Sequence, residues 1–153
     1  MELLIALEQL PPISRLKSSF FAYPLVNAVH VASIGALLTT VVLMDLRILG
    51  AFPALDRAAF IRLMRRFAVA AFIGVLLTGL PMFAIRATEY AFNPAFQFKM
   101  GLLLLAGLNL LAMRLFASEN GLPAKTAGAR TIAAISLVIW PAILLCGRFI
   151  GFL

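Results

Sequence analysis

The residue of this chain whose type and position could do chemistry is its single histidine, His30. It lies in "NAVHVASIGALLTTVVLMDLRILG", residues 27–50, and the fourteen residues from Val31 to Met44 that follow it carry no charge. Upstream, the chain is uncharged from Ser18 onward. An ionisable ring in so apolar a segment costs free energy, so we expect the imidazole to have a specific partner.

The polar neighbours of His30 define one stripe of its helix. Asn27 and Ser33 lie three residues to either side, a spacing that places side chains on one helical face. Such a stripe should face the bundle interior or a cavity rather than lipid. If the helix becomes regular at Pro24, His30 lies about 9 Å below the surface.

A single imidazole at this depth suits an axial ligand of haem b. The propionates would need cations on the same side of the membrane, and the candidates are Arg86, Lys99 and Arg148. Trp140 could line the pocket, and Met82 or Met100 could be the sixth ligand. A copper site from His30 with one of these methionines is a weaker variant.

The alternative is a non-redox protein, a carrier or an accessory subunit, in which His30 is a packing or proton-relay residue. In that case we expect a hydrogen bond across to a neighbouring helix, for instance to Asn109 in "GLNLL". The sequence contains no CxxC, HExxH or phosphate-binding loop and no credible Ser/His/Asp set. Electron transfer is therefore favoured over catalysis, although the absence of these motifs does not exclude an enzyme.

The elements that position His30 are expected to be membrane helices. Hydrophobic residues make up 63% of the chain and charged residues 12%, against about 25% charged in soluble domains. A helix needs about 20 mostly apolar residues to cross a bilayer, and open sheet edges cannot lie in lipid. We predict an all-α fold, a four-transmembrane-helix bundle in one integral membrane domain, 1–153, with helices at about 20–49, 54–84, 94–116 and 129–152.

The N-terminal stretch "MELLIALEQLPP" reads as a short amphipathic helix that lies on the lipid bilayer and is ended by Pro11 and Pro12. At the far end of the first long helix, we expect Asp45 to pair with Arg65 or Arg66 across the first loop. Eight Lys and Arg residues belong to the loops after the first and third helices, and five to the opposite side. This bias places both termini outside the cytoplasm. It also argues against nucleic-acid binding, because the cations are divided between two sides of a membrane.

A single histidine limits haem ligation. The iron would be His/Met coordinated, five-coordinate, or shared between two chains. Self-association is expected on other grounds as well, because the small residues Ala70, Gly74 and Thr78 suit close contact between chains. The simplest homo-oligomer is a symmetric dimer. The redox partner is not identified by the sequence.

Three motifs carry a family resemblance: the His30 segment with its "DLRILG" end, "NPAFQFKMGLLLLAGLN", and "LVIWPAILLCGRFIGF". In this order they resemble an uncharacterised family of bacterial four-helix inner-membrane proteins. The resemblance implies the bacterial inner membrane but no activity. Together with the Lys and Arg bias, this location would make both termini periplasmic. A looser similarity, in helix count and one buried histidine, is to the cytochrome b561 and copper-resistance D type of membrane protein. This chain lacks the several intramembrane histidines of those cytochromes.

Overall fold

Four long helices form the body of the protein in the computed structural model, which describes residues 1–117, 123 and 125–149. They are α3 (Ala22–Leu49), α4 (Arg57–Ile85), α6 (Pro94–Leu115) and α7 (Ala127–Phe149). The described residues contain no named strand. The prediction of an all-α bundle with four long helices is therefore confirmed, and only the end predicted at residue 152 lies outside the described residues.

All four long helices are long and apolar enough to cross a membrane. Their outward faces carry large apolar side chains, such as Leu77, which is 70% exposed, and Val138, which is 71% exposed. Such faces would be unstable in water and match hydrocarbon. The chain is thus a multi-pass membrane protein.

Local capping explains where three of these helices begin or end. Gly50, with a φ of 115°, adopts the left-handed conformation that ends α3. The Asp56 carboxylate accepts a 2.6 Å hydrogen bond from the Ala59 N–H, so α4 begins at Arg57 rather than at residue 54. Asn93 caps α6 in the same way, and Pro94 occupies its first position.

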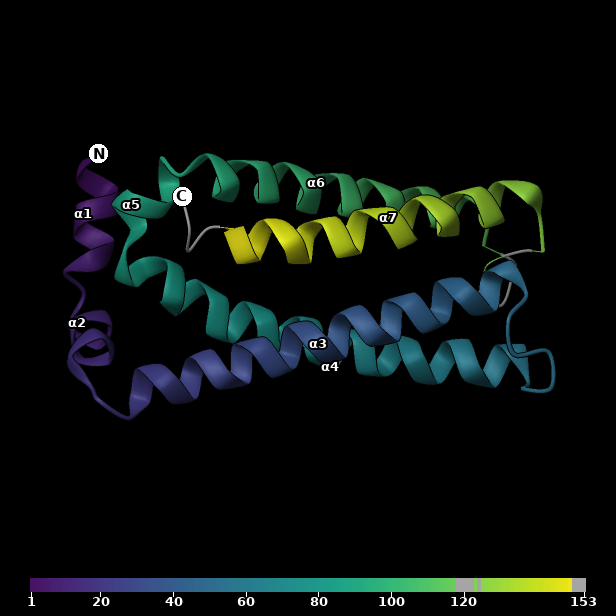
Figure 1. Cartoon of the computed structure of the whole chain (residues 1–153), viewed down its shortest axis with the longest axis horizontal. Coiled ribbons are helices and arrows are strands. Elements are labelled where there is room, and N and C mark those ends of the chain that lie inside the picture. Colours follow the sequence, from purple (N-terminus) through teal and green to yellow (C-terminus); the bar gives the residue numbers. More distant parts are fainter. Residues whose placement is uncertain (118–122, 124, 150–153) are drawn as a thin grey trace.

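The long helices form two antiparallel pairs, α3 with α4 and α6 with α7 (Figure 1). The pairs are joined mainly where α3 packs on α7. Ala129 and Ala133 of α7 are fully buried, and such small side chains let helices approach closely. Between α4 and α6 the Phe83 and Phe96 rings stack with their centroids 5.3 Å apart.

Three short helices lie at the end of the bundle where α3 begins and α7 ends (Figure 1). They are α1 (Glu2–Glu8), α2 (Pro11–Ser18) and α5 (Ala87–Ala91). α1 is the short helix that was predicted before Pro11 and Pro12. The second helix, α2, was not predicted: the two prolines also open it, because a missing N–H costs nothing in a first helical turn. Ile13 of α2 then packs against Ala84 and Ile85 of α4.

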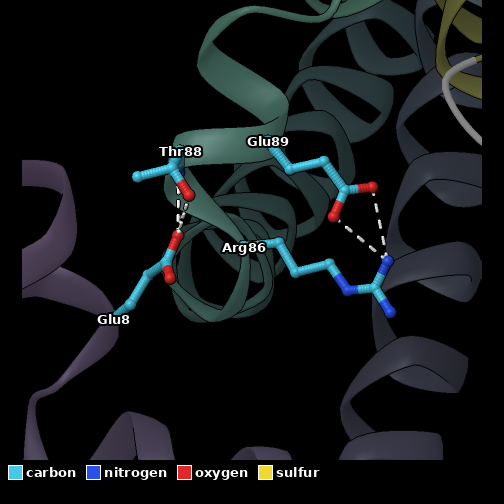
Figure 2. Close-up of polar contacts among 4 residues, drawn as sticks. All are labelled: Glu8, Arg86, Thr88 and Glu89. Atoms are coloured by element: carbon cyan, nitrogen blue, oxygen red, sulfur yellow. Dashed lines mark hydrogen bonds and ion pairs between the residues drawn. The ribbon is translucent and has the colours of Figure 1, made fainter. Parts of the chain in front are cut away.

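A hydrogen-bonded carboxylate fixes α1 to α5 (Figure 2). Glu8 Oε1 accepts from the Thr88 backbone N–H at 2.8 Å and from the Thr88 hydroxyl at 2.6 Å. These two bonds favour the ionised carboxylate and hold the pKa of Glu8 below its usual value. The N-terminal segment is therefore attached to the helical connection between α4 and α6.

Candidate functional site

His30 meets α4 rather than α6. Its Nδ1 lies 2.8 Å from Oγ1 of Thr78, and the imidazole is half-buried between the two helices. The Val75 carbonyl interacts with the same ring. The alternative partner expected from the sequence, Asn109 on α6, is therefore not the one that the structure gives.

The hydrogen-bond network assigns the proton of the imidazole. The Thr78 hydroxyl lies 2.6 Å from the Gly74 carbonyl, which can only accept, so the single hydroxyl proton is directed there. Oγ1 is then an acceptor, and His30 Nδ1 must carry the donated proton. In a neutral imidazole this leaves Nε2 with its lone pair, which is the state of a histidine that ligates a metal.

Two glycines of α4 make room for the polar residues of α3. A Cβ placed on Gly79 would lie 2.9 Å from Cε1 of His30, and one placed on Gly74 would lie 2.6 Å from Oγ of Ser33. Contacts this short do not occur with a real Cβ, so a larger residue at either glycine would force the side chain of His30 or Ser33, or α3 itself, to shift. Gly74 and Thr78, expected between chains, thus contact α3 of the same chain.

The residues of the expected polar stripe do not all face the same way. His30 and Ser33 face α4, whereas Asn27 is exposed on the outer surface of α3. The depth of the site is close to expectation: α3 begins at Ala22, so His30 lies about 12 Å along its axis.

Lys99 is the one of the three predicted cations that is not exposed. It is half-buried on α6 and packs against Gly147 of α7, with Nζ 3.4 Å from the position a Cβ would take there. Arg86 and Arg148 are both exposed. Figure 2 shows Arg86 facing Glu89, with Nη1 3.2 Å from the nearer carboxylate oxygen.

The remaining predicted site residues lie on three different helices, α4, α6 and α7. Met82 is half-buried on α4, one helical turn beyond Thr78, so it shares the face that carries Thr78. Met100 is 48% exposed on α6. Trp140 packs in the cluster between α6 and α7 that includes Ile139 and Ile143. Among the described residues, no group of three or more His, Cys, Asp or Glu could hold a metal ion.

A second buried polar contact lies near the opposite end of α3. Asp45, only 5% exposed, forms a side-chain hydrogen bond with Ser136 of α7, which is 4% exposed. Arg47 instead donates to the carbonyls of Ala51 and Leu55, at 3.3 and 2.8 Å. The expected ion pair of Asp45 with a guanidinium of α4 is therefore replaced by a hydrogen bond to α7.

Sequence reasoning missed the role of Thr78, although a signal was available. The short connection 50–56 joins two antiparallel helices. Residues that are equally far from this connection in the sequence, one before it and one after it, therefore lie side by side. His30 and Thr78 satisfy this relation, as do Ser33 and Gly74. A hydroxyl inside "GVLLTGLP" could thus have been assigned to the imidazole.

The fold and this site define a class: a multi-pass, four-helix membrane protein with one half-buried imidazole fixed between its first two long helices. No family model, curated protein or solved structure matches the chain. The resemblance seen in the motifs therefore stays a prediction.

Proposed function

We propose that the protein binds haem b through Nε2 of His30 and carries electrons near the periplasmic side of the bacterial inner membrane. The observation that supports this function is the hydrogen bond of His30 Nδ1 with Thr78, which leaves Nε2 as the ligating nitrogen.

Three features of the chain support haem binding. His30 supplies an imidazole ligand, and Gly79 leaves the ring space that a Cβ would fill. Lys99, half-buried on α6, would supply a positive charge for a propionate. Haem, when bound, supplies a one-electron redox centre.

Met82 or a residue of another chain would supply a second ligand. Met82 is favoured over Met100 because it lies on the same face of α4 as Thr78, whereas Met100 is largely exposed on α6. Sharing of one haem by two His30 side chains would make the protein a symmetric homodimer. Copper bound by His30 and Met82 is the weaker cofactor proposal.

A second candidate function rests on the same contact. The His30–Thr78 bond joins two helices, and the close approach at Gly74 and Gly79 is typical of tight helix packing in membranes. In this case the protein is a non-redox carrier or accessory subunit, and His30 stabilises the α3–α4 pair.

An absorption spectrum of the purified protein separates the two functions. After expression with ample haem, the cytochrome proposal expects a Soret band, and pyridine haemochrome quantitation gives the haem per chain. One haem per chain supports Met82 or open coordination, and one per two chains supports a shared iron. A colourless preparation from haem-replete cells would favour the packing role.

A further inference from the structure

An apolar groove on the surface of α4 is bordered at one end by two arginines, whose aliphatic stems contribute to its lining. Arg65 and Arg66 line it at one end, and Val69, Ala70 and Ile73 line it further along. These residues recur at helical spacing, so the cations and the apolar side chains follow one another on the same face.

The groove continues between α4 and α3. Ala70 also lines a larger hollow whose floor is made by small residues of both helices, among them Ala32, Ala36 and Ala71. A Cβ placed on Gly35, which lines the same hollow, would meet nothing within 4 Å. Along α3 the hollow extends from Thr40 to Val29, about 16 Å, which is close to the depth of one leaflet of a core about 30 Å thick.

The two arginines lie at the level of lipid headgroups. From Phe67 to the end of α4 at Ile85 the helix is about 28 Å long, which nearly fills the hydrocarbon core. The guanidinium groups therefore emerge where phosphates are found, while the hollow lies below them among acyl chains. Guanidinium groups bind phosphate oxygens in bidentate geometry.

We propose that this groove binds one anionic phospholipid, with its phosphate at Arg65 and Arg66 and one acyl chain in the hollow between α3 and α4. A second copy of the chain is a poorer occupant. A two-fold axis normal to the membrane would bring the same arginines of both copies to the same depth, and like charges would face each other.

Native mass spectrometry tests this site with phosphatidylglycerol and phosphatidylcholine of identical acyl chains. The wild-type protein should retain phosphatidylglycerol in preference to phosphatidylcholine. Replacement of both arginines, Arg65→Gln with Arg66→Gln, should weaken phosphatidylglycerol retention by about fivefold for each charge removed. Arg62→Gln is the matched control, because Arg62 is exposed on the same end of α4 but does not line the groove.

Ala70→Phe tests whether the lipid occupies the hollow or is only attracted by the positive charge of the arginines. It fills the hollow and leaves both arginines, so it should lower retention of the lipid as well. Equal retention of the two lipids by the wild type would overturn the proposal, as would full retention of phosphatidylglycerol by Ala70→Phe. A shift from dimer to monomer in Ala70→Phe, with lipid retention unchanged, would assign the groove to a second copy instead.

Discussion

His30 and Thr78 stand 48 positions apart and join α3 to α4 through a 2.8 Å contact between the imidazole Nδ1 and the threonine Oγ1. Because Thr78 directs its own proton to the Gly74 carbonyl, this contact fixes both the orientation and the tautomer of the ring. The same hydrogen bond therefore contributes to the packing of two membrane helices, and in the proposed function it would leave Nε2 available as a ligand.

Replacement of Thr78 by valine should remove the hydrogen bond without changing the volume of the side chain. We expect a loss of about 0.6 kcal/mol in the free energy of unfolding, the average for interhelical hydrogen bonds in membranes. Haem affinity should fall by about 10- to 100-fold, since the ring loses the group that orients it. Unfolding in detergent and haem titration measure the two effects, and Thr78→Ser should restore both. Unchanged affinity in Thr78→Val would show that this contact does not orient the ligand.

Gly79→Ala should destabilise the α3–α4 pair. The added Cβ would lie 2.9 Å from Cε1 of His30, so the ring or the helix must shift. The matched control is Gly101→Ala on α6, where a Cβ meets nothing within 4 Å. At Gly101 the intrinsic preference of alanine for helix should raise the free energy of unfolding by up to about 1 kcal/mol. Thermal unfolding of both variants is the measurement, and a gain at Gly79 equal to that at Gly101 would contradict the close packing of His30.

The prediction of the fold from the sequence succeeded where apolar length decides the outcome. Four segments of bilayer-spanning length gave the four long helices, with ends within three residues of those observed in the described part of the chain. The short α5 escaped prediction because five residues carry no periodicity, and its contact with Glu8 is 80 positions distant. The start of α4 was placed too early because Asp56 acts as a cap.

The attachment of α1 should depend on pH through Glu8. Hydrogen bonds from Thr88 hold the folded pKa of Glu8 below its unfolded value of 4.5. The contribution of this carboxylate is therefore present above about pH 4.5 and is lost as the pH falls through the lower, folded pKa. The protection factors of the α1 amides, which compare each exchange rate with the intrinsic rate at the same pH, should fall over that acidic range.

Two variants control the interpretation of the Glu8 experiment. Glu8→Gln should exchange rapidly in α1 at neutral pH and show no further acid step. Glu89→Gln removes the exposed pair with Arg86 and should leave α1 unchanged. Wild-type protection factors in α1 that stay constant through the acidic range would contradict the role of Glu8.

The orientation of the bundle can be tested with single cysteines in a Cys146→Ala background. A cysteine at Gln9, exposed near the end of α1, should react with an impermeant maleimide in intact cells. A cysteine at Lys125, exposed before α7, should react only after the cells are opened. This result is expected from the Lys and Arg bias of the loops. The reverse labelling pattern would place both termini in the cytoplasm.

The candidate site was less predictable than the fold. Hydrophobicity showed that His30 needs a partner, but it could not choose between α4, α6 and another chain, because Thr78, Asn109 and Met82 are all compatible with a buried imidazole. The choice depends on rotation of each helix about its axis, which an almost uniformly apolar surface does not encode. For the same reason Asn27 was expected inside the bundle but is exposed.

The most direct test of the haem proposal is a titration of the purified protein with haem b, followed by the Soret absorbance and by pyridine haemochrome quantitation. The wild-type chain should bind at a fixed ratio, one haem per chain or per two chains. His30→Ala should show no saturable Soret band, because the sequence has no other histidine. Asn27→Ala, which changes an exposed residue one turn away, should bind as the wild type does. A wild-type chain that binds no haem, or a His30→Ala variant that binds as much as the wild type, would contradict the account.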